Sequence, residues 1–145
     1  MPGRYIIKSV ATIFTCACAV HYLNQYVGKI VVCEGSSMEP TLYNNDVLIV
    51  EGVSVKFDKL KKGDIVLSKS PTNPTEHICK RLLGLPGDKV RHGVIVPQGH
   101  VWLEGDNSFD SIDSRQYGPV PQDLLEGRAF CKLLPLTDMT LFKSR

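Results

Sequence analysis

The sequence has little of what marks nucleic-acid-binding, disulfide-stabilised or metal-binding proteins. Its net formal charge is only +2 and it has no basic run interleaved with aromatic residues, which argues against a nucleic-acid partner. Its five cysteines lack the paired spacing of a disulfide framework or a zinc site, so they are interpreted as small buried thiols. No internal repeat or low-complexity tract occurs. No metal or cofactor is implied.

Acidic residues are absent before Glu34, and the segment from residue 5 to residue 27 is mostly apolar or small. Three basic residues accompany it: Arg4, Lys8 and Lys29. A cleaved secretory signal, a mitochondrial presequence and a retained membrane anchor all fit this composition. Because about 20 residues are needed to span the hydrocarbon, only the whole segment would reach across. Its length leaves the three interpretations open.

After residue 29 the pattern changes to short apolar runs separated by Gly and Pro. This change divides the chain into an anchor or targeting segment, residues 1–29, and a catalytic β domain, residues 30–145. The runs are rich in β-branched residues and lie at residues 30–33, 47–50, 65–67, 94–96, 100–103 and 129–134. With no sustained helical period, they predict a mostly β sandwich or barrel. One single-turn helix is expected near residues 121–126.

Three blocks carry side chains suited to catalysis. They are Gly35-Ser36-Ser37-Met38-Glu39-Pro40-Thr41-Leu42, Lys80-Arg81-Leu82-Leu83-Gly84-Leu85-Pro86-Gly87-Asp88, and Gly105-Asp106-Asn107-Ser108-Phe109-Asp110-Ser111-Ile112-Asp113-Ser114-Arg115. A serine hydroxyl needs a base to take its proton near neutral pH. Lysine can be that base if burial lowers its pKa, and Ile78, Cys79, Leu82 and Leu83 around Lys80 are apolar. Arg81 would face the other side of a strand and cannot deprotonate.

The three blocks, in this order, resemble the type I signal peptidase family of membrane-bound serine proteases. The resemblance covers roughly residues 32–134. The short spacing and the segment at residues 100–107 are similar to the mitochondrial inner membrane members of that family. The family fold is a curled, barrel-like antiparallel β domain with one N-terminal membrane helix. The resemblance therefore favours a retained anchor at residues 1–29.

The resemblance also implies a catalytic pair. The family nucleophile stands immediately before the methionine of the first block, which is Ser37, and Ser36 is then a bystander. Lys80 occupies the position of the general base, in the Ser-Lys variant of the serine hydrolases. Ser111 occupies a position whose hydroxyl hydrogen-bonds and orients the lysine.

Supporting roles follow from the same resemblance. Asp113 and Arg115 match positions that form an ion pair beside the site, and Gly105 allows close backbone approach. The oxyanion donor is a departure, because many bacterial members carry a serine where this chain has Gly35. The backbone N–H of Ser37 must then serve, with Gly35 leaving room for the oxyanion or a second donor coming from elsewhere.

The implied function is a membrane-bound serine endopeptidase. It would remove N-terminal sorting segments from proteins delivered across the mitochondrial inner membrane, with its catalytic domain facing the intermembrane space. A second subunit of the same family is the expected partner. Four other interpretations stay open: a signal peptidase of the bacterial or endoplasmic reticulum type, a self-cleaving repressor-type Ser-Lys protease, a non-catalytic tethered module that binds targeting peptides, and a histidine-based protease. The last would use His77, His92 or His100 with Asp106 or Asp113.

Overall fold

The computed structural model describes residue 10, residues 12–18 and residues 28–143. Residue 10 and residues 12–18 are helical. Among the described residues, no helix combines the length and the apolar character needed to cross a membrane. The membrane anchor predicted at residues 1–29 lies largely outside the described residues, so it stays a prediction.

The domain after residue 28 is mostly β, as its β-branched runs predict. Short helical turns lie between several of the strands, and a Gly or Pro stands near the end of most strands. The elements are β1 (Lys29–Val32), β2 (Val47–Glu51), α2 (Val53–Lys56), β3 (Ile65–Lys69), β4 (His77–Gly84), η1 (Arg91–Gly93), β5 (His100–Glu104), α3 (Ser114–Tyr117), β6 (Val120–Pro121), η2 (Gln122–Leu124), β7 (Leu125–Leu134), η3 (Leu136–Asp138) and β8 (Thr140–Leu141).

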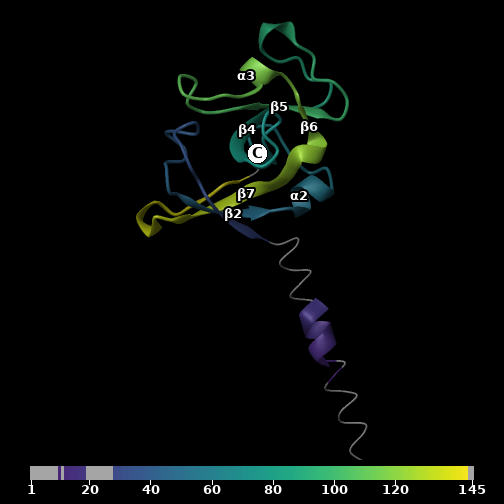
Figure 1. Cartoon of the computed structure of the whole chain (residues 1–145), viewed down its shortest axis with the longest axis vertical. Helices are drawn as coiled ribbons and strands as arrows, with labels where there is room; N and C mark the ends of the chain where they lie inside the picture. Colours follow the sequence, from purple (N-terminus) through teal and green to yellow (C-terminus); the bar gives the residue numbers. More distant parts are fainter. Residues whose placement is uncertain (1–9, 11, 19–27, 144–145) are drawn as a thin grey trace, which may run out of the picture.

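All of these strands belong to one antiparallel sheet. Its order is β1-β2-β7-β3-β4-β5-β6, and β8 pairs separately with β7. Figure 1 shows the long strand β7 crossing the domain beside β2, with α3 close to β5 on the opposite side. The predicted mostly β, antiparallel class is confirmed.

Two local predictions had different outcomes. The run at residues 94–96 is not a strand, because it forms only a single bridge, between Ile95 and Lys89. Gly93 and Pro97 bracket it closely, and Pro97 has no N–H to extend a ladder. The single helical turn expected near residues 121–126 is present as the three-residue η2.

Two apolar clusters form the core. The first joins residues from β2, β3 and β7 to residues of the loop after β1: Cys33, Met38, Leu42, Leu48, Val50, Ile65, Leu67 and Ala129. The second joins residues of β3, β4, β5, β6 and β7: Val66, Leu82, Val101, Leu103, Val120 and Leu125. The first cluster matters for the site because Met38 and Leu42 belong to the Ser37 block, so hydrophobic burial holds that loop against the sheet.

Candidate active site

The loop after β1 leaves Ser37 partly exposed and buries two apolar side chains that follow it. Met38 and Leu42 are 4% and 1% exposed, whereas Ser37 is only half-buried. The backbone N–H groups of Thr41 and Leu42 both donate to the Met38 carbonyl, which closes a tight turn. Gly35 begins the turn with a φ of +89°, a conformation that glycine adopts without strain.

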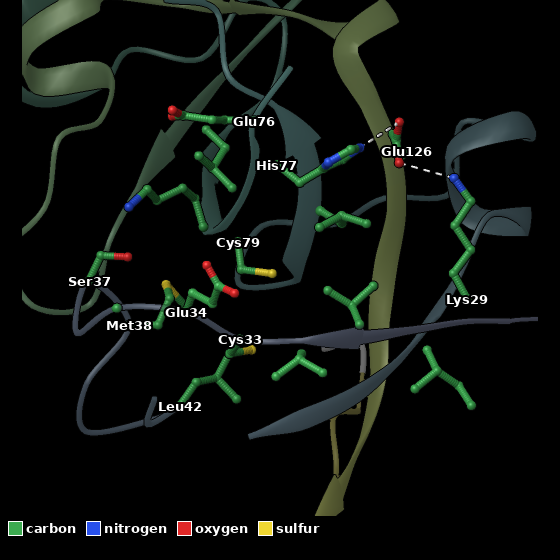
Figure 2. A pocket seen from close by; sticks show the side chains of 17 residues that line it. Lys29, Cys33, Glu34, Ser37, Met38, Leu42, Glu76, His77, Cys79 and Glu126 are labelled. Atoms are coloured by element: carbon green, nitrogen blue, oxygen red, sulfur yellow. Dashed lines mark hydrogen bonds and ion pairs between the residues drawn. The ribbon is translucent and has the colours of Figure 1, made fainter. Parts of the chain in front are cut away.

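A cavity of about 830 Å³ separates the Ser37 loop from strand β4 (Figure 2). Ser37 and Lys80 both line it. Its walls also include residues of β1, β3 and β7, and combine apolar side chains with carboxylates and thiols. Among the lining residues are Val31, Cys33, Glu34, Met38, Leu42, Leu67, Glu76, Ile78, Cys79 and Glu126. The predicted nucleophile and the predicted base are therefore parts of one site.

Lys80 is a buried amine on β4, with 4% of its surface exposed. Its Nζ donates a hydrogen bond to Ser111 Oγ at 3.1 Å. Burial lowers the pKa of Lys80, against the opposing charge of Asp113, because the charged form loses its hydration. A larger fraction of the amine is therefore neutral near pH 7 than for a surface lysine.

Ser111 connects Lys80 to a buried carboxylate. Its Oγ accepts from Lys80 and donates to Asp113 Oδ2 at 2.6 Å. Asp113 is fully buried, but Arg115 donates hydrogen bonds to both of its carboxylate oxygens, from Nε at 2.8 Å and from Nη2 at 2.6 Å. Burial opposes ionisation of Asp113, yet the hydrogen bonds from Arg115 and Ser111 prevail and lower its pKa to about 2. The carboxylate is thus ionised, and Arg115 balances its charge.

Gly105 fits this arrangement because no side chain has room there. A Cβ at this position would lie 2.2 Å from Ser111 Oγ and 2.4 Å from the Ser37 carbonyl oxygen. The Gly105 N–H also donates to Asp113 Oδ2 at 2.8 Å. Gly105 is therefore the point where the third block touches both the first block and the Lys80 support.

A second set of contacts lies on the other side of β4. Arg81 donates from Nε and Nη2 to the two oxygens of Asp106, at 2.7 and 2.6 Å, and Thr41 Oγ1 also donates to Asp106. Asn107 N donates to the Ser37 carbonyl at 3.0 Å. Sequence analysis assigned no structural role to Thr41 or Arg81. The sequence could have indicated this contact, because the planar guanidinium of an arginine presents two N–H donors that match the two oxygens of a carboxylate.

The structure brings together all of the support residues predicted from the sequence. Ser111, Asp113, Arg115 and Gly105 lie in one hydrogen-bonded group around Lys80. Gly35 lines the same cavity as Ser37, and its N–H donates to Asn44 Oδ1 at 3.0 Å. Ser36 is not among the residues that line this cavity, and its hydroxyl donates to Asp110.

The histidines are placed differently from Lys80. Figure 2 shows the ring of His77 turned away from Ser37 and toward Glu126, which it meets at 3.3 Å. His100 Nδ1 contacts the Gln98 carbonyl, and the side chain of His92 lies outside the described part of the chain. Across residues 10, 12–18 and 28–143, no group of three or more His, Cys, Asp or Glu side chains is arranged to hold a metal ion.

Comparisons with known proteins find close relatives. The family model described as "Signal peptidase, peptidase S26" matches residues 6–94 and 89–134. The chain is 46% identical over 136 residues to mitochondrial inner membrane protease subunit 1 of Homo sapiens, covering 88% of this chain and 82% of that protein. It is 49% identical over 129 residues to subunit 1 of Xenopus tropicalis, with 82% and 77% covered.

Two further similarities are more distant. The chain is 39% identical over 127 residues to mitochondrial inner membrane protease subunit 2 of Saccharomyces cerevisiae, with 78% of this chain and 72% of that protein covered. A crystal structure of a signal peptidase I from Enterococcus faecalis V583 aligns with a TM-score of 0.42 and 26% identity, over 48% of this chain and 96% of that one.

Proposed function

Because this chain belongs to the signal peptidase family, peptidase S26, and is a serine peptidase of the mitochondrial inner membrane protease type, we propose that Ser37 is its nucleophile and Lys80 its general base. The predicted family and enzyme class are confirmed by matches over most of the chain. One observation carries the proposed pair: the buried Lys80 amine lines the same cavity as Ser37 and is hydrogen-bonded to a neutral hydroxyl.

The proposed reaction needs only these groups and water. As Ser37 Oγ attacks the scissile carbonyl, its proton moves to the neutral Nζ of Lys80. The tetrahedral intermediate collapses to an acyl-enzyme, and the Lys80 ammonium gives its proton to the leaving amine. A water molecule, deprotonated by Lys80, then hydrolyses the ester and frees Ser37. Proton transfer to a positioned base contributes typically 10²–10⁴-fold in rate.

Ser111 would hold the lysine in position through both steps. Its oxygen accepts from Lys80 while its proton is committed to Asp113, so the lone pair of Ser111 always faces the amine. The bidentate contact between Asp113 and Arg115 fixes that direction, and their opposite charges add no net charge to the site. They are positioning residues for Lys80.

The oxyanion is proposed to be stabilised by the backbone N–H of Ser37. Gly35 supplies no side-chain donor, and its φ of +89° shapes the turn that aims this N–H. A preorganised backbone donor of this kind is worth on the order of 3 kcal/mol in the transition state. The open space beside Gly35, where no atom lies within 4 Å of a would-be Cβ, leaves room for the substrate carbonyl.

The proposed substrates are proteins that carry N-terminal sorting segments and reach the far side of the mitochondrial inner membrane. The catalytic domain, residues 30–145, would face the intermembrane space, with residues 1–29 retained as its anchor. The similarity to proteins named subunit 1 and subunit 2 supports a hetero-oligomer with a second member of the same family. No nucleic acid enters this proposal.

The test is covalent labelling of the nucleophile. Purified full-length chain is incubated with a fluorescent β-lactam acylating probe, and the labelled residue is mapped by mass spectrometry. We expect Ser37 to be labelled, and Ser37→Ala and Lys80→Met each to abolish labelling while their circular dichroism spectra stay native. Ser36→Ala is the matched control and should keep most of the labelling rate.

Two outcomes would contradict the proposal. Labelling that persists in Ser37→Ala but disappears in Ser36→Ala would move the nucleophile to Ser36. Absence of labelling in the native chain, together with tight binding of a presequence peptide, would favour the non-catalytic tethered module.

A further inference from the structure

Two cysteines line the cavity that Ser37 and Lys80 also line. Cys33 begins the segment that leads from β1 to Ser37, and Cys79 directly precedes Lys80 on β4. Both line the cavity, and Cys79 packs against the core cluster that contains Cys33. Figure 2 shows the two sulfur atoms facing the same space, one above the other. All five cysteines are free in this structure.

The two thiols differ in access and in ionisation. Cys33 is 8% exposed, whereas Cys79 is only half-buried and so is open to a reagent entering the cavity. Interaction with Cys33 lowers the pKa of Cys79 against the effect of burial, and Lys80 lowers it further. The same interaction and burial raise the pKa of Cys33. Since the thiolate is the attacking form, Cys79 is the first of the pair to react.

We propose that Cys33 and Cys79 form a redox-active dithiol site in the catalytic cavity, which small disulfides of the oxidised glutathione class convert to an intramolecular disulfide. Nothing in the proposed proteolytic mechanism uses these thiols. The site is therefore an addition to that mechanism, placed where its oxidation changes the cavity itself.

The exchange proceeds in two steps. The Cys79 thiolate attacks one sulfur of the small disulfide, forming a mixed disulfide and releasing one thiolate. Cys33 loses its proton to water and attacks the Cys79 sulfur, which forms the Cys33–Cys79 bond and releases the second small thiolate. The two cysteines are oxidised by two electrons, and the small disulfide is reduced to two thiols.

The bond would join the two walls that hold the catalytic pair. A disulfide draws its two Cβ atoms to within about 3.5–4.5 Å of each other. Cys33 is followed four residues later by Ser37, and Cys79 is followed at once by Lys80. A displacement of about 1 Å between reacting groups can cost on the order of 10²-fold in rate. Oxidation is thus expected to lower the rate of Ser37 acylation at least about tenfold, an effect that rests on the proposed function.

The experiment treats the purified full-length chain with oxidised glutathione and maps disulfides by mass spectrometry after non-reducing proteolysis. We expect a cross-linked peptide pair containing Cys33 and Cys79, and a fall in β-lactam labelling of Ser37 that dithiothreitol reverses. Cys33→Ser and Cys79→Ser should each lose the cross-link. Cys33→Ser should stop at the mixed disulfide of Cys79 with glutathione, whereas Cys79→Ser should keep its own reduced labelling rate under oxidant. Cys79→Ser, at the half-buried position, decides the matter if Cys33→Ser does not fold.

Cys131→Ser is the matched control, because Cys131 is buried like Cys33 but lies on β7 outside the cavity lining. It should oxidise and lose labelling as the native chain does. Two results would overturn the proposal: glutathione adducts or other pairings without the Cys33–Cys79 cross-link, and a complete cross-link that leaves labelling unchanged. If the reduced chain is not labelled at all, the proposed function fails, while disulfide mapping still decides whether the dithiol site exists.

Discussion

Lys80 and Arg81 are adjacent basic residues on one strand, yet the fold gives them opposite environments. Lys80 is buried and hydrogen-bonded to the neutral Ser111, and burial lowers its pKa. Arg81 is partly exposed, and its hydrogen bonds to Asp106 raise its pKa further. Because alternate side chains of a strand face opposite sides, one step along β4 separates an amine with a lowered pKa from a fixed cation.

The two faces of β4 have different roles in this small protease. The Lys80 side holds the proposed chemistry, and the Arg81 side holds the scaffold. Both sides end in the segment from Gly105 to Arg115, through Ser111 on one side and through Asp106 on the other. That segment in turn bonds to the Ser37 loop through Asn107. The position of the base relative to the nucleophile thus depends on both contacts.

The largest effect is expected from exchanging the residue types at positions 80 and 81. Lys80→Arg keeps the positive charge and most of the length, but guanidinium does not deprotonate, so the base is lost. We expect the rate of Ser37 acylation to fall on the order of 10⁴-fold. Arg81→Lys is the matched control, and losing the bidentate fork should cost it about tenfold or less. Equal losses in both variants would contradict the division between the two sides of β4.

The pH dependence of Ser37 acylation tests the proposed role of Lys80. A rate that needs neutral Lys80 rises with pH and levels off above a pKa that lies below the ordinary value for lysine. The charge of Asp113 raises the pKa of Lys80, and Arg115 lowers it. Asp113→Asn removes the first charge and leaves the second, so the rising limb should move to lower pH. Stopped-flow labelling between pH 5 and 10 would measure it. A limb that moves to higher pH, or that follows a His77→Gln variant instead, would contradict a lysine base.

The Arg81 side is expected to show its effect mainly in stability. Asp106→Ala removes an acceptor for Arg81 and Thr41 and should cost about 1.5–3 kcal/mol in the free energy of unfolding at pH 7. Burial opposes ionisation of Asp106, but Arg81 and Thr41 lower its pKa below the ordinary value. Its contribution is therefore complete above that ordinary value and is lost as the pH falls through the lowered pKa. Urea unfolding at pH 7 and pH 3 checks this.

The exposed Asp123 provides the control, since Asp123→Ala should change the unfolding free energy by less than about 0.5 kcal/mol. A cost for Asp106→Ala that stays constant between pH 7 and pH 3 would show that packing, and not the ion pair, accounts for it.

The sequence predicts those features of the site that depend on neighbouring residues, and it does not predict contacts between residues far apart along the chain. Strand alternation and apolar neighbours are local, so Lys80 could be chosen over Arg81 from the chain alone. The support of Lys80 by Ser111, Asp113 and Arg115 came only from the family resemblance. The Thr41–Asp106 contact spans 65 positions and the Cys33–Cys79 pair joins two separate elements. No periodicity encodes such contacts, because the sheet order that creates them is set by packing of the whole domain.

The smallest expected effect concerns two glycines that share one conformation. Gly35 and Gly87 have φ values of +89° and +86°, and neither has an atom within 4 Å of a would-be Cβ. Alanine at either position should therefore cost the same backbone strain, about 1–2 kcal/mol, seen as similar drops in thermal stability. Only Gly35→Ala should also slow acylation, by about tenfold, because the strain falls on the turn that aims the Ser37 N–H. Gly35→Ser should behave like Gly35→Ala, and kcat measured beside the melting temperature distinguishes the two glycines. An increase in acylation by Gly35→Ser would instead show that a hydroxyl at this position reaches the oxyanion and supplies the donor that the chain lacks.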